Sequence, residues 1–232
     1  MSPLTRLRPK VLCPVDGTAL LDLALGRAQA VAARCAVNLH HGREAVEAHL
    51  ADRDVHLSVE EPEALGTAGA VAAVAEWVGD AGLLVVNGDT WCPADLAPSV
   101  DGWDRERVRV VVAGSPELGA RARIVGSLMP PDAVRSLRPE PTGLYEVCWG
   151  PLLQEGRLDV VGWEGPFVDC ATPRDYLAAN MAASGGVSVV GEGAVVDGVV
   201  ERSVLWPGVS VAAGERLVDA IRASHEMTVL VR

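Results

Sequence analysis

Lysine is almost missing from this chain: Lys10 is its single lysine, against nineteen arginines. A compact ammonium is not interchangeable with a planar guanidinium where one point charge must meet a phosphate. Lys10 follows Arg8-Pro9, and the proline ring restricts the backbone beside the charged side chain. Composition alone leaves two interpretations open, a lysine retained for an anionic ligand or a surface lysine near the chain end.

Long apolar runs and paired cysteines are also missing. No uncharged apolar run reaches the roughly 18 residues that a membrane span needs, and the basic N-terminal segment lacks the apolar stretch of a signal peptide. The five cysteines are scattered without a C-x-x-C pair, and the five histidines show no metal-ligand spacing. We therefore expect a cytoplasmic protein with reduced thiols and no membrane partner, disulfide framework or zinc site.

Positive charge is scarce as well, because the 232 residues carry a net charge of −11. This balance disfavours nonspecific binding to nucleic acids or anionic membranes. It does not exclude a small phosphorylated ligand, since binding of such a ligand depends on the electrostatic field at its own site. Arg6, Arg8 and Lys10 concentrate positive charge within the first ten residues, where no acidic residue occurs. A solvated basic tail is the alternative interpretation.

Short apolar runs alternate with segments of helical spacing, which predicts an α/β fold. Continuous apolar runs such as 83–86 indicate parallel strands covered on both faces of a sheet. The expected helices are 18–34 (with Thr18 as N-cap), 43–50, 66–79 and 173–183, and the expected strands are 35–39, 55–59, 83–86, 107–113 and 142–149.

The pattern changes after Ser184-Gly185-Gly186. Apolar residues then recur every six positions, at Val199, Leu205, Val211 and Leu217. This period resembles a hexapeptide-repeat, left-handed β-helix of one or two coils, and a β-meander with coincidental spacing is the alternative. So short an extension cannot stand alone and should pack on the main domain. We expect a domain at 1–184 and an extension at 185–232.

Two acidic residues follow predicted strands. Asn87-Gly88-Asp89 ends one apolar run, and Asp169 ends another. Ligands of open α/β sheets bind at the carboxyl ends of strands, and Mg²⁺ commonly uses one or two carboxylates together with substrate phosphates. The Gly66–Gly69 turn (Gly-Thr-Ala-Gly) would present amides at a helix N-terminus, which suits an anion or a nucleotide. The alternatives are an ordinary turn and an ordinary helix cap.

Several motifs occur in one order along nearly the whole chain. Together they resemble the sugar-1-phosphate nucleotidyltransferases, whose P-K-x-x-x-P-V-x-G-x-P-L-L segment is similar to residues 9–21. The other matching strings are Asn38-Leu39-His40-His41, Glu61-Pro62, Leu65-Gly66-Thr67-Ala68-Gly69, Val86-Asn87-Gly88-Asp89, Gly143-Leu144-Tyr145 and Val168-Asp169-Cys170-Ala171-Thr172-Pro173-Arg174-Asp175-Tyr176-Leu177.

The resemblance implies a Rossmann-like (GT-A-like), mostly parallel sheet flanked by helices, with the short β-helix-like extension. It implies nucleotidyl transfer from a nucleoside triphosphate to a sugar 1-phosphate, giving a nucleotide-sugar and pyrophosphate. The implied roles are Lys10 as catalytic residue, Asp89 and Asp169 as Mg²⁺ ligands, Leu65, Gly66, Thr67, Ala68, Asn87 and Gly88 at the nucleotide, and Gly143 and Thr172 at the sugar. The tail favours the mannose-1-phosphate guanylyltransferase-like branch and a homo-oligomer formed through the extension.

The sequence departs from the family pattern in three places. The family opens with a strand and a G-x-G-T-R-x-x-P loop, and this sequence begins inside or just past that loop. Without that strand we expect unpaired strand edges. The family's mid-chain lysine is absent, so we expect an arginine such as Arg138 to replace it, and Ala171 stands where glycine is usual.

These departures keep a second function open, a truncated or degenerate homologue that binds nucleotide-sugars as a regulatory or assembly subunit. A start codon further upstream would reconcile both readings. For the chain beginning at Met1 we expect little or no nucleotidyl transfer, because the glycine-rich loop supplies amides that hold phosphates.

Overall fold

The computed structural model describes residues 1–119 and 122–231, which form two compact units. The first unit comprises Met1–Ala24, Gly88–Cys92 and Pro166–Arg232, and the second comprises Leu25–Asn87 and Pro93–Gly165. Helix α1 (Leu20–Gln29) begins in the first unit and ends in the second. Across the described residues, every helix is too short or too polar to cross a membrane.

The second unit contains a four-stranded sheet in the order β5 (Leu83–Val85), β8 (Ile124–Met129), β7 (Arg109–Ala113) and β9 (Asp159–Trp163). Strand β8 runs antiparallel to β5 and β7, whereas β7 and β9 are parallel. A separate parallel pair joins β3 (Ala36–Leu39) to β4 (His56–Val59). Within residues 1–119 and 122–231, β3 and β5 each pair along one edge. The expected effect of a missing strand stays a prediction.

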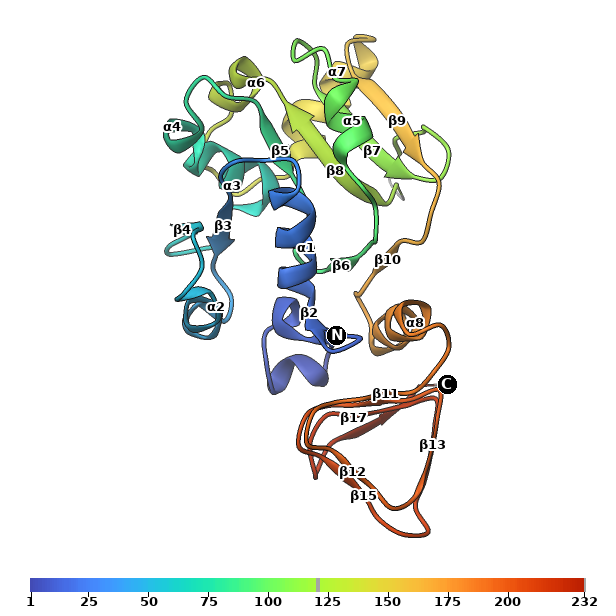
Figure 1. Cartoon of the computed structure of the whole chain (residues 1–232). Coiled ribbons are helices and arrows are strands. Elements are labelled where there is room, and N and C mark those ends of the chain that lie inside the picture. Colours follow the sequence, from blue (N-terminus) through green and yellow to red (C-terminus); the bar gives the residue numbers. More distant parts are fainter. Residues whose placement is uncertain (120–121, 232) are drawn as a thin grey trace. The chain divides into compact units, whose positions relative to one another are not determined.

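Short helices cover these strands (Figure 1). They are α2 (Arg43–Leu50), α3 (Gly66–Ala73), α4 (Ala75–Val78), α5 (Ala97–Asp101), α6 (Pro131–Arg135), the π-helix η3 (Tyr145–Trp149) and α7 (Gly150–Gln154). The core of the unit is apolar because alternating valines of β7 face helices α3 and η3. Val110, Val112, Met129 and Leu144 are almost fully buried in it.

The first unit begins with two 3₁₀ turns, η1 (Leu4–Arg6) and η2 (Lys10–Leu12). A tight hairpin follows, in which β1 (Pro14–Val15) pairs with β2 (Thr18–Ala19). Its turn residues Asp16 and Gly17 both have positive φ, the conformation of a type I′ turn. The unit also contains the antiparallel pair β6 (Thr90–Trp91) and β10 (Val168–Asp169), and helix α8 (Pro173–Ala183).

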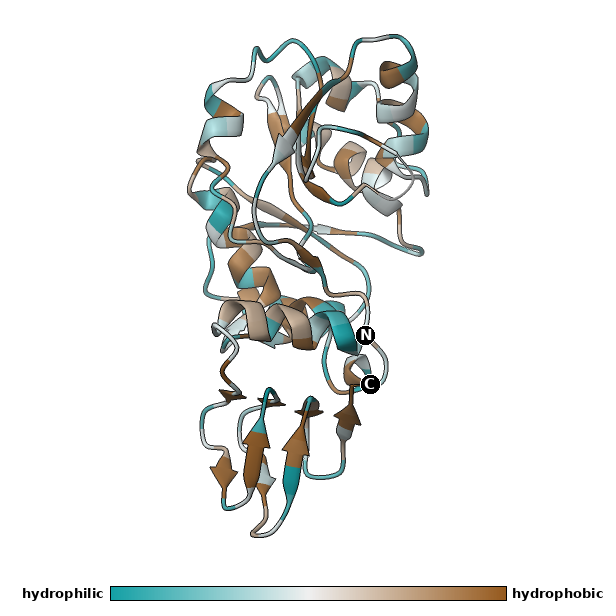
Figure 2. Cartoon of the chain, turned by 90° about the vertical axis from the view of Figure 1, so that its right-hand side faces the viewer, coloured by the Kyte–Doolittle hydropathy of each residue, from teal (hydrophilic) through white to brown (hydrophobic). Residues whose placement is uncertain are grey.

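The C-terminal residues wind into parallel coils of short strands (Figure 1). The strands of the coils are β11 (Val189–Val190), β12 (Val195–Val196), β13 (Val199–Glu201), β14 (Val204–Leu205), β15 (Ser210–Val211), β16 (Arg216–Val218) and β17 (Ala220–Arg222). The last strand, β18 (Thr228–Leu230), pairs antiparallel with β17. Val189 pairs with Val204, and Val204 pairs with Ile221, each one coil later. Figure 2 shows that these strands are mostly apolar, and the expected β-helix-like extension is confirmed.

One hydrophobic core runs through the whole first unit. Leu4, Trp91 and Tyr176 pack in it with Leu205 and Ile221 of the coils. The extension therefore packs as expected, although the compact unit that holds it also includes residues before 185. The proposed domain boundary between residues 184 and 185 stays a prediction. Leu205, Val211 and Leu217 of the six-residue repeat are buried, whereas Val199 is 44% exposed.

Three predicted elements were wrong in kind or extent. Residues 142–149 do not form a strand, because Tyr145–Trp149 is a π-helix that buries Cys148 and Trp149. Thr18 is not a helix N-cap, since it pairs in the β1–β2 hairpin and α1 begins at Leu20. The helix expected at 66–79 is divided at Val74 into α3 and α4.

The pairing of β5 is a further correction. We expected residues 83–86 to be a buried parallel strand, but β5 is only partly buried and its pairing within the described chain is antiparallel, with β8. Apolar composition does not reveal pairing direction, because both ladder types accept the same side chains. The four-stranded sheet is therefore mixed, and the α/β class is confirmed.

Candidate active site

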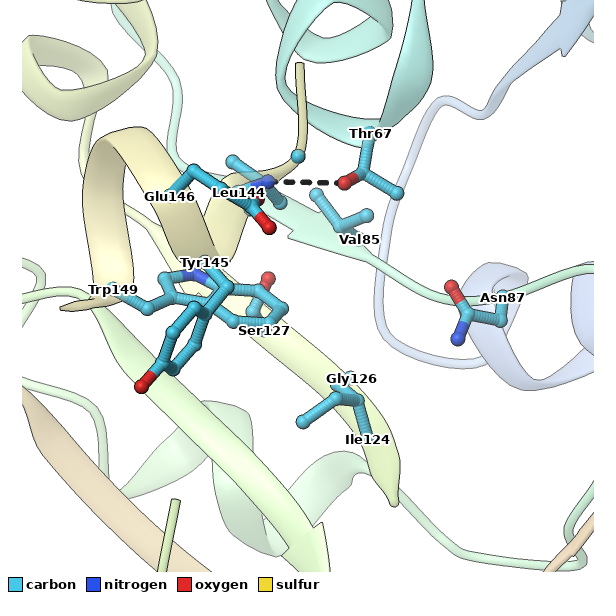
Figure 3. A pocket seen from close by; sticks show the side chains of 11 residues that line it. Thr67, Val85, Asn87, Ile124, Gly126, Ser127, Leu144, Tyr145, Glu146 and Trp149 are labelled. Atoms are coloured by element: carbon cyan, nitrogen blue, oxygen red, sulfur yellow. Dashed lines mark hydrogen bonds between the residues drawn. The ribbon is translucent and has the colours of Figure 1, made fainter. Parts of the chain in front are cut away.

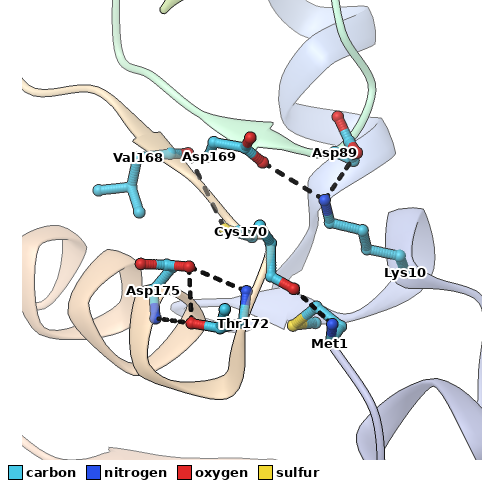
Figure 4. A network of polar contacts seen from close by, with 9 residues as sticks. Met1, Lys10, Asp89, Val168, Asp169, Cys170, Thr172 and Asp175 are labelled. Atoms are coloured by element: carbon cyan, nitrogen blue, oxygen red, sulfur yellow. Dashed lines mark hydrogen bonds and ion pairs between the residues drawn. The ribbon is translucent and has the colours of Figure 1, made fainter. Parts of the chain in front are cut away.

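Three side chains from distant parts of the sequence meet in the first unit. The Nζ atom of Lys10 lies 2.7 Å from Oδ2 of Asp89 and 3.4 Å from Oδ1 of Asp169 (Figure 4). Asp89 directly precedes β6, and Asp169 is the last residue of β10 and pairs with Thr90. This register brings the two carboxylates together, which confirms the predicted proximity.

The two carboxylates set the charge state of Lys10. Partial burial by itself would lower the pKa of the ammonium, but the hydrogen bond and charge of Asp89, with the charge and hydrogen bond of Asp169, raise it above its ordinary value. Lys10 is therefore a fixed positive charge at neutral pH. The side chains of Asp89 and Asp169 are 38% and 57% exposed, so both are accessible to an incoming ligand.

The same two carboxylates fit a divalent cation. Their oxygens converge on one cation, the ammonium of Lys10, so the site already holds positive charge at this point. In the part of the chain that the structure describes, no cluster of three or more acidic, histidine or cysteine side chains is arranged around a common point. Two carboxylates are a suitable ligand set for a hard cation that completes its coordination with substrate phosphates and water.

Helix α8 and the coils hold the segment that carries Lys10. The hydroxyl of Tyr176 donates a hydrogen bond to the carbonyl oxygen of Pro14, and Nε1 of Trp206 donates to that hydroxyl at 3.0 Å. The amide of Asp16 donates to Oδ1 of Asn180 at 3.0 Å. Sequence reasoning missed these three supporting side chains. Two of them lie outside the matching motifs, and no local signal connects residue 206 with residue 14.

Thr172, predicted at the sugar, caps helix α8. Its Oγ1 accepts a hydrogen bond from the amide of Asp175 at 3.2 Å and donates to Oδ2 of Asp175 at 2.6 Å (Figure 4). The Asp175 carboxylate in turn accepts from the Thr172 amide, which completes a capping box. Helix capping is sufficient to explain why residue 172 is a threonine. The sugar-binding role of Thr172 stays a prediction.

A cavity of about 190 Å³ lies in the second unit (Figure 3). Residues of α3, β5, β8 and segment 143–149 line it. Thr67 and Asn87, predicted at the nucleotide, and Gly143, predicted at the sugar, are all in its wall. The structure thus brings these three predicted residues together, and their ligands stay predictions.

The turn that begins α3 packs tightly against residues 140–144. Gly66 has φ of +65°, and a side chain there would overlap the carbonyl oxygen of Thr142. The amide of Ala68 donates to that same carbonyl at 3.0 Å, and the amide of Leu65 donates to Oε2 of Glu60 at 2.8 Å. The glycine is thus required by the fold, and the amide of Ala68, one of those expected to face an anion, is bonded within the protein.

Leu65, Gly66 and Ala68 do not line the cavity, and Gly88 packs near Leu21 and Val11 in the first unit. Their nucleotide-binding roles stay predictions. Arg138, expected to replace the family's lysine, is exposed and also lies outside the cavity wall.

Sequence reasoning missed one buried carboxylate. Glu60 is 3% exposed, and its Oε1 accepts a hydrogen bond from Nδ2 of Asn38 at 2.7 Å. It joins β3 and β4 to the start of α3 through the Leu65 amide. The position of Glu60 directly before the Glu61-Pro62 motif was the only sequence signal for a functional or structural role. Acidic residues in loops are ordinarily exposed, so burial of this carboxylate was not expected.

Comparison with known proteins agrees with this geometry. Residues 4–160 match the family of MobA-like NTP transferase domains. The chain belongs to this family. Over 218 residues it is 30% identical to N-acetylmuramate alpha-1-phosphate uridylyltransferase of Caulobacter vibrioides, an alignment that covers 78% of this chain and 90% of that protein. The predicted nucleotidyltransferase function is confirmed at the level of the family.

Solved structures show the same fold. Mannose-1-phosphate geranyltransferase from Thermus thermophilus matches with a TM-score of 0.67 and 18% identity, covering 100% of this chain and 90% of that one. HddC from Yersinia pseudotuberculosis, complexed with GMP-PN, matches with a TM-score of 0.58 and 16% identity, covering 76% of this chain and 90% of that one. The first match includes the C-terminal coils, so the coils are part of the shared fold.

Proposed function

We propose that this NTP transferase moves a nucleotidyl group from a nucleoside triphosphate to a sugar 1-phosphate, releasing pyrophosphate, with Mg²⁺ as its metal. The observation that carries the proposal is the convergence of Lys10, Asp89 and Asp169 in the first unit. In such a transfer, an oxygen of the sugar phosphate attacks the α-phosphorus and pyrophosphate leaves. The reaction demands neutralised phosphate charge and an in-line approach more than covalent help from the protein.

Each of the three side chains has a role that follows from its chemistry. Asp89 and Asp169 would hold Mg²⁺, which when bound neutralises phosphate charge and orients phosphate oxygens. Lys10 would stabilise negative charge that develops on the transferring phosphate, and its compact ammonium can turn from the carboxylates toward a phosphate without moving the backbone. Tyr176 and Trp206 would fix the segment from which Lys10 extends.

The names of the relatives suggest the substrates to test. A uridylyltransferase at 30% identity suggests UTP as donor and N-acetylmuramate 1-phosphate as acceptor. The coils and the Thermus structure suggest mannose 1-phosphate, with GTP as the donor expected from the sequence. N-acetylglucosamine 1-phosphate belongs in the same panel because it shares the ring of the muramate sugar.

Pyrophosphate release tests the proposal, and it tests equally the expectation from the sequence that the chain beginning at Met1 transfers little or no nucleotide. Each donor is paired with each acceptor, with Mg²⁺ and with EDTA, and the best pair is then used for Asp89→Asn and Asp169→Asn. We expect each variant to lose at least about 100-fold in turnover, because one preorganised charge is removed. Asp101→Asn, at the exposed last residue of α5, is the matched control and should retain full activity.

Unchanged turnover in both variants would remove the carboxylates from the mechanism. Pyrophosphate release from none of the pairs, together with measurable binding of a nucleotide-sugar, would support the alternative of a non-catalytic binding subunit.

A further inference from the structure

The turn that carries Lys10 is too short to be stable by itself. Helix η2 comprises only Lys10–Leu12. The Leu12 amide donates to the carbonyl oxygen of Pro9 at 2.9 Å, and the Cys13 amide donates to that of Lys10 at 3.1 Å. A single 3₁₀ turn does not repay the conformational entropy of its residues. Contacts at the two ends of η2 must therefore set the direction of the Lys10 side chain.

A tryptophan of the coils holds the C-terminal end of this turn. Nε1 of Trp206 donates to the hydroxyl of Tyr176 at 3.0 Å, and that hydroxyl donates to the carbonyl oxygen of Pro14, just beyond the turn. Trp206 is 2% exposed, and its own amide donates to the carbonyl oxygen of Arg222 at 2.9 Å. The coils thus fix the indole that supports Pro14.

The face of the same indole contacts the other end of the turn. The Cζ atom of Arg8 lies 4.6 Å from the centroid of the Trp206 ring. This distance is within the range of a cation–π contact, and tryptophan is the most favourable partner for a guanidinium. The Arg8 side chain, which is half-buried, is thus held against a fixed surface of the coils.

Pro9 transmits the orientation of Arg8 to Lys10. Its ring fixes its own φ, here −52°, and also restricts the backbone of the residue before it. Few backbone angles between Arg8 and Lys10 are therefore free to change. Once the guanidinium is stacked on the indole, the position from which the Lys10 side chain starts is largely determined.

We propose that Arg8 is a positioning residue for Lys10, and that Trp206 holds both ends of the Lys10 turn. Its ring face holds Arg8, and its N–H holds Pro14 through Tyr176. The inference rests on the proposed function, in which the ammonium must reach the transferring phosphate. A displacement of about 1 Å is enough to slow such a reaction strongly. The coils thereby contribute to catalysis through one side chain.

Arg8→Ala removes the stacked guanidinium and leaves Lys10, Asp89 and Asp169 in the protein. We expect kcat with the best substrate pair to fall at least about 10-fold, while KM for each substrate changes less than about 2-fold. Arg6→Ala removes the same charge from an exposed position of the same segment and should change neither constant. Thermal unfolding checks the fold, and Arg8→Gln, a milder change, is used if Arg8→Ala does not fold.

A Lys10→Ala background shows whether Arg8 acts through Lys10. There we expect Arg8→Ala to cause no further loss of kcat, because a positioning residue has no effect once the group that it positions is absent. A further loss of about 10-fold would show that Arg8 acts independently of Lys10 and would overturn the inference.

The single lysine of the chain allows a test that needs no turnover. Lysine labelled with ¹³C at Cε gives the NMR signal of Lys10 alone. With EDTA present, we expect separate chemical shifts for its two Hε protons in wild type and Arg6→Ala, because the contacts with Asp89 and Asp169 fix the side chain. In Arg8→Ala the two shifts should merge toward one averaged value.

Three further results would overturn the inference. The Hε shifts could stay separate in Arg8→Ala, kcat could stay unchanged, or KM for the nucleoside triphosphate could rise in place of a fall in kcat. The last result would assign Arg8 to direct phosphate contact. If the wild-type protein turns over no substrate pair, the proposed function fails, and the NMR comparison still decides whether Arg8 positions Lys10.

Discussion

At the scale of single residues, the ammonium of Lys10 separates two carboxylates that would repel each other without it. Asp89 and Asp169 both contact it. Asp89 directly precedes strand β6, and Asp169 ends strand β10. A metal ion bound by the two carboxylates would compete with the ammonium for the same oxygens. Under the proposed function, Lys10 would then be free to contact a phosphate.

Lys10→Arg should keep the fold but reduce kcat/KM by at least about 100-fold, because the planar guanidinium cannot occupy the position of a compact ammonium. Pyrophosphate release with the best substrate pair measures the loss, and thermal unfolding checks the fold. Arg6→Lys exchanges the same two residue types at an exposed position. It is the control and should leave kcat/KM unchanged. Full turnover in Lys10→Arg would exclude a catalytic role for Lys10.

The buried cysteines should be chemically inert. Burial raises the pKa of Cys13 and Cys148 to about 11 and that of Cys170 to about 12. The thiolate is the reactive form, so at pH 8 alkylation in the folded protein should be at least about 100-fold slower than in the unfolded chain. Mass spectrometry after a timed iodoacetamide pulse measures this, and rapid native labelling of these three sites would contradict the burial.

The same shifts predict a stability change at alkaline pH. Because the folded-state pKa values lie above the ordinary thiol value near 9, their contribution is fully present below pH 9 and is lost as pH rises through about 11 to 12. Cys170→Ala should therefore show a smaller fall in unfolding free energy between these pH values than wild type.

At the scale of elements, helix α8 organises the first unit. Asp169 precedes it, Thr172 caps it, and Tyr176 and Asn180, one turn apart, hold the β1–β2 hairpin. Residues four apart lie on one helical face, so a single face supports the segment that follows Lys10. The hydrogen bonds that hold the β1–β2 hairpin therefore depend on one helix.

Tyr176→Phe should lower the free energy of unfolding by about 1–3 kcal/mol, because the carbonyl of Pro14 and the indole N–H of Trp206 lose their partner in the core. Tyr145→Phe removes the hydroxyl of the chain's other, exposed tyrosine and should change stability by less than about 0.5 kcal/mol. Urea unfolding of both variants gives the comparison. Equal stabilities would show that water replaces the buried partner.

Thr172→Ala should cost about 1 kcal/mol by removing the cap of α8, whereas Thr172→Ser should retain it. Chemical unfolding measures both. An Ala variant as stable as wild type, but with a raised KM for the sugar 1-phosphate, would contradict the capping role and support the predicted sugar contact.

At the scale of the whole molecule, the first unit is assembled from three separate stretches of sequence. Its core joins Leu4 and Cys13 from the first stretch, Trp91 from the second, and Trp206 and other residues from the third. The last stretch includes every C-terminal coil. The coils are thus part of the core that supports Lys10.

A chain that ends at residue 184 should not fold its first unit, because it loses the coil half of this core. We expect loss of cooperative unfolding for that unit and loss of pyrophosphate release. The internal control is hydrogen exchange in β7 and β8 of the second unit. Retained activity of the shortened chain would instead establish the domain boundary predicted between residues 184 and 185.

The sequence by itself determined the family, the α/β class, the coils and the meeting of Asp89 with Asp169, because ordered motifs and strand ends carry this information locally. The sequence-based prediction was wrong at residues 142–149, because valine and aromatic residues favour a strand. In the structure Tyr145–Trp149 form a π-helix, which buries Cys148 and Trp149. Only the tertiary structure decided the pairing of β5, the network of Tyr176 with Trp206, and the contact of Arg8 with the same indole. These contacts join distant residues, and their energies depend on packing that no local pattern encodes.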